Sequence, residues 1–265
     1  MVHCLSRYFR PGFLKTKLVV ISFLIIFYHV PSFARPLQVG VIWFPPFYVI
    51  EKEGDKVTGI RGINVEIVTR VLDEINQPYH LKYYPAKRLY SNMIHGKIDL
   101  FYGIRVPSSH VSSDHILHSN QTISKIVLKA YYMRGTPPLK QKEELIGKSV
   151  IVFRGYGYGG FIEYIKDPYN RMTIYTADTQ FNGFKMLAKG RADYLIAFER
   201  PAKAALRRFN EGFYNKVLSS NPLYIADGYF VMSRKTPNAK KLMERMEKAY
   251  NKLDAEGVFD GMIVE

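Results

Sequence analysis

Short apolar segments alternate along this chain with segments whose apolar residues recur every three or four positions. Residues 37–44 form an apolar run that ends at two prolines, and a polar turn is expected at 51–56. Residues 63–75 then show helical spacing, with Asn64 as a candidate N-cap. Strands that alternate with helices of this length favour parallel pairing, so we expect an α/β fold of mostly parallel sheets flanked by helices. The remaining expected elements are strands at 81–84, 98–103, 149–153, 172–175, 193–198 and 228–233, and helices at 88–95, 161–166, 179–189, 201–209 and 239–253.

Two junctions in the chain share one pattern, which suggests two similar lobes. A helix ends at Gly96 or Gly190, a basic residue follows, and a strand then opens with Asp99 or Asp193. Glycine takes the left-handed conformation that stops a helix, and a cation is favourable near the last carbonyls. Any helix-to-strand junction can resemble this, but two copies separated by a turn-rich stretch at 134–144 indicate two α/β lobes. No strand follows the helix at 239–253, so we expect it to pack on the first lobe.

Residues 1–34 have the composition of a secretory signal peptide. Four basic residues precede an apolar run at 18–30, and a small-x-small sequence ends at Ala34. An apolar helix of that length reaches about 20 Å, against about 30 Å of hydrocarbon in a membrane. We therefore expect cleavage after Ala34, with a retained membrane anchor as the alternative. Cleavage would also remove Cys4, the only cysteine, so the mature chain would have neither a disulfide nor a lipid anchor.

The charge balance is strongly basic. The sequence has 38 basic and 23 acidic residues, and four of the basic residues but no acidic ones lie in residues 1–34, which leaves +11 after cleavage. In the cytoplasm such a balance would suggest a nucleic-acid partner, but export makes that interpretation unsuitable. Attraction to anionic solutes, attraction to anionic envelope surfaces and a generally basic proteome all stay open.

Six short sequences stand out along the chain, PPF at 45–47, GINVEI at 62–67, GKID at 96–99, ELIGKSV at 144–150, GRAD at 190–193 and AEG at 255–257. In order and spacing they are similar to extracellular solute-binding protein family 3, the periplasmic binding proteins of ABC importers in the polar amino acid class. The resemblance covers nearly all of residues 35–265. It implies a two-lobed type II periplasmic binding fold, with the first lobe at 35–120 and 226–265, the second at 121–225, and two crossing strands as a hinge.

The resemblance also implies ligand contacts where strands end. It places an aromatic side chain against the ligand after the first strand, at Trp43 and Phe44 in this chain. Aromatic faces bind apolar stems or cations, although packing in the core is the alternative. Tyr102, Gly103 and Arg105 come at the carboxyl end of the third strand, which is where an open α/β sheet binds its ligand.

Both amino-acid anchors of the family are altered in this chain. The arginine that clamps the α-carboxylate falls on His110, and a neutral imidazole cannot replace a charged guanidinium. Arg105 could supply the cation instead, unless it is a solvated surface residue. The aspartate that pairs with the α-amino group falls on Phe198, and Glu199 follows it. A standard α-amino acid is therefore less expected here than in the family.

A glycine-rich turn at 155–160 follows one expected strand and opens a helix. Free backbone N–H groups at such a turn make an anion site, so Arg154, Tyr156 and Gly157 are further candidates, with Tyr156 and Tyr158 as cleft walls. A flexible loop without a ligand role is the alternative. The turn also matches the dinucleotide pattern G-x-G-x-x-G, but such a cofactor is not expected outside the cytoplasm.

These observations predict a periplasmic solute-binding protein of a Gram-negative bacterium. We expect a monomer without catalytic residues, metal or cofactor, which captures a small polar or anionic, amino-acid-like solute and delivers it to an inner-membrane ABC permease. The spacing of His110, Asp114, His115 and His118 does not bring all four to one face, so a metal site is not expected. Two alternatives stay open. One is a dehydratase-like enzyme using Glu199, His110 or Glu66 as acid or base, and the other is a ligand-sensing module without transport.

Overall fold

Eight strands form the main path of one mixed sheet, in the order β4-β1-β5-β12-β7-β10-β8-β9. The computed structural model describes residues 35–104 and 114–262, and the expected ligand contacts at Arg105 and His110 lie outside the described residues. At one end of the sheet β1 (Leu37–Val41) pairs in parallel with β4 (Tyr79–Tyr83) and β5 (Leu100–Ile104). At the other end β8 (Ser149–Phe153) pairs in parallel with β9 (Thr173–Ala177) and β10 (Tyr194–Phe198). Each lobe thus has the expected parallel strands.

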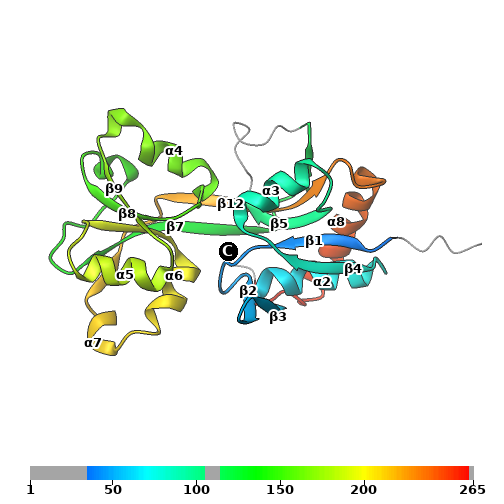
Figure 1. The fold of residues 1–265 in the computed structure, drawn as a ribbon, viewed down its shortest axis with the longest axis horizontal. Helices are drawn as coiled ribbons and strands as arrows, with labels where there is room; N and C mark the ends of the chain where they lie inside the picture. Colours follow the sequence, from blue (N-terminus) through cyan, green and yellow to red (C-terminus); the bar gives the residue numbers. More distant parts are fainter. Residues whose placement is uncertain (1–34, 105–113, 263–265) are drawn as a thin grey trace, which may run out of the picture. The chain divides into compact units, whose positions relative to one another are not determined.

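Two long antiparallel strands join these parallel groups. β7 (Ser124–Met133) pairs with β10, and β12 (Tyr224–Ser233) pairs with both β5 and β7. Figure 1 shows both strands running from one lobe into the other. Periodicity along the sequence predicted only the second half of β12 and no strand at the residues of β7. Two three-residue strands complete the sheet, with β6 (Ile116–His118) on β12 and β11 (Val217–Ser219) on β7.

Helices cover the sheet in each lobe (Figure 1). The helix at the C-terminal end of the described chain packs against α2 and β12, as expected for a helix that returns to the first lobe. No described helix is both long enough and apolar enough to cross a membrane. The α-helices are α2 (Ile63–Glu74), α3 (Ala86–Ile94), α4 (Phe161–Lys166), α5 (Gln180–Ala188), α6 (Glu199–Leu206), α7 (Glu211–Tyr214) and α8 (Ala239–Ala255), and short 3-10 turns lie at η2 (Lys142–Leu145), η3 (Tyr158–Gly160) and η4 (Pro168–Asn170).

The start of α2 corrects one expectation. Gly62, not Asn64, occupies the N-cap position, with φ at 127°. A Cβ on Gly62 would lie 2.5 Å from the carbonyl oxygen of Phe47, so this position requires glycine. Asn64 is buried in the first turn, and its backbone N–H donates to the Phe47 carbonyl at 3.0 Å. The turn after the first strand is therefore held tightly against the beginning of the helix.

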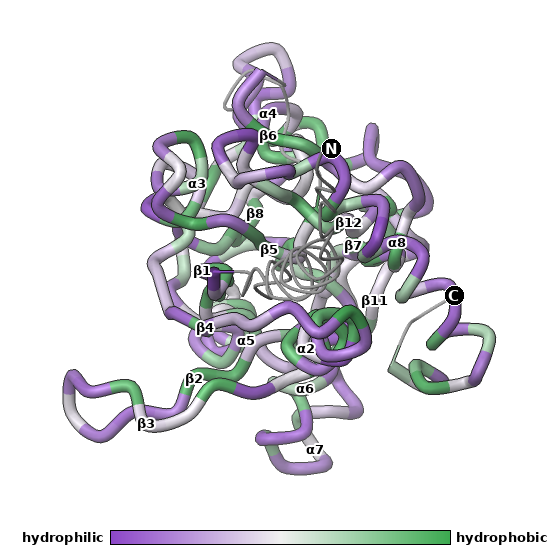
Figure 2. The backbone as a smooth tube through the Cα atoms, turned by 90° about the vertical axis from the view of Figure 1, so that its right-hand side faces the viewer, coloured by the Kyte–Doolittle hydropathy of each residue, from purple (hydrophilic) through white to green (hydrophobic). Residues whose placement is uncertain are grey.

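A hairpin replaces the polar turn expected at 51–56. It consists of β2 (Val49–Glu53) and β3 (Lys56–Arg61), which form a separate two-stranded sheet. Its side chains are mostly exposed, so the segment lacks the apolar pattern by which a strand is recognised. Figure 2 shows the hairpin extending from the rest of the described fold with a hydrophilic tip.

The two repeated junctions have the same geometry in the structure. Gly96 and Gly190 are both left-handed, with φ at 73° and 65°. The Asp99 carboxylate accepts a hydrogen bond from the backbone N–H of Gln38 at 2.8 Å, where β1 begins. The Asp193 carboxylate accepts one from the N–H of Ser149 at 2.8 Å, where β8 begins. Each aspartate therefore ties its own strand to the neighbouring parallel strand, which explains why the pattern occurs once in each lobe.

Candidate functional site

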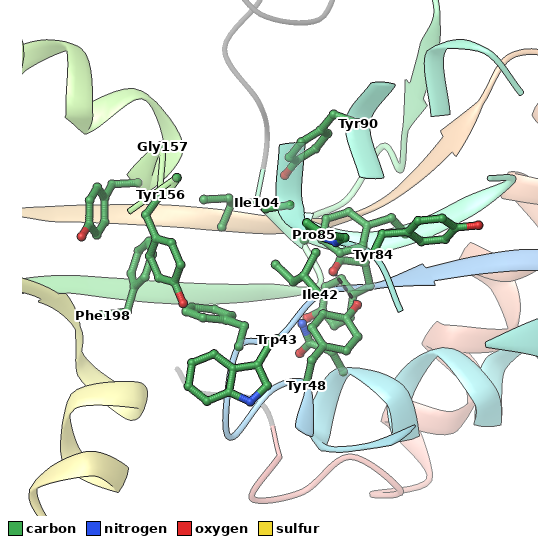
Figure 3. Close-up of a pocket in the computed structure, with 18 of the residues that line it drawn as sticks. Ile42, Trp43, Tyr48, Tyr84, Pro85, Tyr90, Ile104, Tyr156, Gly157 and Phe198 are labelled. Atoms are coloured by element: carbon green, nitrogen blue, oxygen red, sulfur yellow. Dashed lines mark hydrogen bonds between the residues drawn. The ribbon is translucent and has the colours of Figure 1, made fainter. Parts of the chain in front are cut away.

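A pocket of about 260 Å³ opens between the two lobes (Figure 3). From the first lobe it is lined by the segments that follow β1 and β4 and by β5, and from the second by the loop after β8 and the end of β10. The carboxyl ends of parallel strands are where α/β sheets place their ligands. Its aromatic members are Trp43, Phe44, Tyr48, Tyr83, Tyr84, Tyr90, Phe101, Tyr102, Tyr156, Tyr158 and Phe198.

Inside this pocket, one ring of the first lobe contacts two rings of the second. The ring centroid of Phe44 lies 5.6 Å from that of Tyr156 and 5.6 Å from that of Phe198, and both contacts are edge-to-face. This geometry is the favoured one for aromatic pairs, each of which contributes about 0.5–1.5 kcal/mol beyond the area buried. Trp43, next in sequence to Phe44, is 41% exposed, and its indole lies at the edge of the pocket in Figure 3.

The inner wall of the first lobe is held by tyrosine hydroxyls. Tyr48 donates to the backbone carbonyl of Tyr102 at 2.7 Å, and Tyr102 donates to the hydroxyl of Ser124 at 2.7 Å. Both tyrosines are buried, and burial raises their pKa values well above the ordinary value, so the phenols stay neutral. Tyr102 and Gly103, both predicted from the end of the third strand, thus line the pocket, although the Tyr102 hydroxyl is engaged within the protein.

The glycine-rich turn is arranged differently from the expected anion site. Tyr158 is buried, and its hydroxyl accepts from the Phe153 N–H at 2.7 Å and donates to the Ile196 carbonyl at 3.3 Å. The N–H groups of Gly160 and Ile162 both donate to the carbonyl of Gly157, at 2.9 and 3.4 Å. These two donors therefore serve the loop itself. Of the two tyrosines expected as cleft walls, Tyr158 acts mainly as an internal anchor of the turn.

Charge enters the described lining of the pocket through one ion pair. Arg154 and Asp178 both line the pocket and are both exposed, and the Arg154 Nε lies 2.6 Å from the Asp178 Oδ1. The hydrogen bond to Asp178 raises the pKa of Arg154. Arg154 was predicted from the sequence as a ligand contact, and Asp178 was not. The signal was present, since the two residues directly follow β8 and β9, whose carboxyl ends lie side by side.

Glu199 does not line the pocket. Its carboxylate lies 2.9 Å from the Lys129 Nζ and 2.8 Å from the Lys203 Nζ. Burial raises the pKa of Glu199, but the hydrogen bonds from both lysines outweigh it, so the pKa lies below its ordinary value. Glu66, another candidate acid, pairs with Arg70 one turn further along α2 at 2.8 Å. No cluster of three potential metal ligands occurs among the residues that the structure describes.

Comparisons with known proteins identify the fold. No protein-family model and no curated protein matches the sequence. A histidine kinase sensor domain with similarity to periplasmic binding proteins superposes with a TM-score of 0.69 at 17% identity, over 87% of this chain and 95% of that chain. The chain has the type II periplasmic binding protein fold.

Two further structures of this fold come from amino-acid binders. An ancestral arginine-binding protein bound to arginine superposes with a TM-score of 0.67 at 19% identity, over 87% of this chain and 97% of that one. An amino acid ABC transporter substrate-binding protein from Streptococcus pneumoniae, bound to L-arginine, gives 0.65 at 17% identity, over 86% and 92%. Identities this low establish the type II periplasmic binding fold and leave the ligand of this chain to be argued from its own pocket.

Proposed function

We propose that this protein binds a small amino-acid-like solute between its lobes and delivers it to an inner-membrane ABC permease. The observation that carries the proposal is the pocket itself, which is lined from both lobes and has the Arg154–Asp178 pair among its exposed members. A guanidinium binds a carboxylate, and a carboxylate binds an ammonium group. A polar or anionic solute with a carboxylate could thus replace Asp178 as the partner of Arg154.

Ligand binding would act on the equilibrium between open and closed lobes. A solute that touches both walls stabilises the closed arrangement by its difference in affinity for the two states. β7 and β12 are the segments that would bend, since they run through both lobes. The lobe boundaries given above, a monomeric state and export to the periplasm after cleavage at Ala34 belong to the same proposal.

A non-enzymatic role is supported by how the candidate acids are engaged. Glu199 is held by two lysines and Glu66 by Arg70, and neither is among the described residues that line the pocket. A general acid or base must reach the substrate directly or through one water molecule. Ligand sensing without transport is the second candidate function, and it is supported by the similarity to a histidine kinase sensor domain.

Binding can be tested with a matched pair of charge variants. The purified protein is screened by thermal shift against amino acids, opines, organic acids and short peptides, and any stabilising compound is titrated by calorimetry. Arg154→Gln should lower the affinity for that compound at least tenfold. Arg61→Gln is the control, because Arg61 pairs with Glu51 at the same 2.6 Å and is similarly exposed, but lies on the hairpin. The proposal fails if no compound stabilises the protein, or if both variants weaken binding equally.

Transport is separated from sensing in cells. If the protein serves an importer, a strain that lacks it should lose most of its uptake of the labelled compound identified above. Unchanged uptake, together with a lost transcriptional response to the compound, would favour the sensing role.

A further inference from the structure

The described interior of the pocket is aromatic and uncharged. Eleven of its 22 described lining residues are aromatic, against 14% of the whole sequence, so the enrichment is not a reflection of composition. The charged members among them are Arg154 and Asp178, which are exposed and paired with each other. The part of a ligand that reaches inward therefore meets rings rather than ions.

Phe198 excludes a buried ammonium group from the inner wall. The family resemblance places an amine-binding aspartate at this position, and the phenylalanine found here is 3% exposed and packs edge-on against Phe44. A phenyl ring has no carboxylate or other hydrogen-bond acceptor, and an ammonium group taken out of water without such a partner is strongly unfavourable. The charged end of the ligand therefore belongs at the Arg154–Asp178 pair.

Neutral hydrogen-bonding groups complete the inner surface. Burial alone raises the pKa of Tyr90 and of Tyr156, so both phenols are neutral. Within the described part of the chain, neither hydroxyl hydrogen-bonds to another residue. In Figure 3 Tyr90 comes from α3 on one side of the pocket and Tyr156 from the opposite lobe. These hydroxyls can bond to an uncharged substituent of a ligand.

We propose that the solute carries an aromatic ring, or a flat apolar group of similar size, which lies among Trp43, Tyr90 and Tyr156 with its charged end at Arg154 and Asp178. This inference rests on the proposed solute-binding function and specifies its substrate class. Size agrees with it, because a dry cavity of roughly 150 Å³ holds benzene. The pocket of about 260 Å³ therefore has room for a ring and a short polar chain.

The pocket contains its own reporter for the test. Trp43 is the only tryptophan in the sequence, so intrinsic tryptophan fluorescence reports this pocket alone. The purified protein is titrated with two matched pairs, L-phenylalanine against L-leucine and 3-phenylpropionate against hexanoate. Choline serves as a ring-free cation, because aromatic faces also bind quaternary ammonium groups. Calorimetry of the same mixtures supplies the affinities.

In at least one pair, the ring-bearing compound should bind tenfold or more tightly than its partner and shift the Trp43 emission. Tyr156→Leu should lower that affinity at least tenfold, and Tyr156→Phe should still bind the ring-bearing compound more tightly than its partner. Tyr169→Leu is the control, because Tyr169 is 89% exposed and lies outside the pocket.

Three results would overturn the inference. If a ring-free acid or amino acid binds as tightly as its ring-bearing partner, solute binding stands and the ring requirement fails. If choline binds most tightly, the pocket is a cation site. If none of the compounds, nor any in the wider thermal-shift screen, is bound, the proposed function fails and the inference fails with it.

Discussion

The two aspartates at the repeated junctions should contribute unequally to stability, because one is buried and the other is exposed. The Asp99 carboxylate accepts from the Gln38 N–H at 2.8 Å and from the Thr236 hydroxyl at 2.9 Å, and this residue is 2% exposed. The Asp193 carboxylate also accepts from two donors, the N–H and the hydroxyl of Ser149, at 2.8 and 2.6 Å, but on the surface. The pair thus compares one hydrogen-bonding pattern at two levels of burial.

Replacing Asp99 with alanine leaves two donors without their acceptor in a buried place. Each such donor costs about 1–3 kcal/mol, so for two donors we expect the free energy of unfolding to fall by about 2–6 kcal/mol. At Asp193, water can take the place of the carboxylate, and the expected loss is about 1 kcal/mol. For a chain of this length 1 kcal/mol corresponds to roughly 2–4 °C in Tm. Asp99→Ala should therefore lower Tm by about 4–24 °C, and Asp193→Ala by about 2–4 °C.

Differential scanning calorimetry and urea unfolding of both variants measure these losses. Because the protein has two lobes, the urea transition is followed by far-UV circular dichroism as well as by Trp43 fluorescence, and the two midpoints are compared. An Asp193→Ala loss equal to or larger than that of Asp99→Ala would refute the argument. So would an Asp99→Ala loss below about 1 kcal/mol, since water would then be reaching the buried junction.

Three further predictions concern single groups. Tyr158→Phe should lower the free energy of unfolding, measured in urea, by about 1–3 kcal/mol, because a buried backbone N–H loses its acceptor. A loss below about 0.5 kcal/mol, the usual effect of a surface substitution, would contradict this prediction. Hydrogen bonds from Ser149 hold the pKa of Asp193 below its ordinary value. Its stabilising effect should therefore be complete above about pH 4 and lost as the pH falls through the lower folded-state pKa. Asp193→Asn should reduce the fall of Tm at acidic pH. An unchanged dependence of Tm on pH would show that the Asp193 carboxylate does not cause that fall. Glu199→Gln should leave ligand affinity within about twofold while lowering Tm, because the carboxylate balances two lysines; a tenfold loss of affinity would place Glu199 in the site.

Elements with a clear apolar period were predictable from the sequence. β8 and α4 have the predicted bounds, α2 and β10 differ from theirs by one residue at one end, and α5 is one residue shorter than predicted at each end. In contrast, β7 was not assigned, because its exposed and buried positions are mixed over ten residues and its partners β10 and β12 lie far away in sequence. Sequence periodicity reports which face of a segment is buried, and it does not report which distant strand lies beside it.

The candidate site was predictable at the strand ends and less so between the lobes. Of the residues expected to bind ligand, Trp43, Phe44, Tyr102, Gly103, Arg154, Tyr156 and Gly157 line the pocket. The sequence did not reveal that Phe44 meets Tyr156 and Phe198, because such a contact depends on how two separately folded sheets face each other. Asp178 was missed for a related reason, since its relation to Arg154 comes from the pairing of β8 with β9.

The path of the chain also sets when each lobe can be finished. β12 is the antiparallel neighbour of β5, and α8 covers the face of the sheet that contains Phe230. The half of β12 that pairs with β5 and the whole of α8 lie in the first lobe in space but come after the second lobe in sequence. A chain emerging from the ribosome therefore keeps one edge of β5 unpaired until residues beyond 224 are released. The lobe that begins first is completed only after the second lobe has been made.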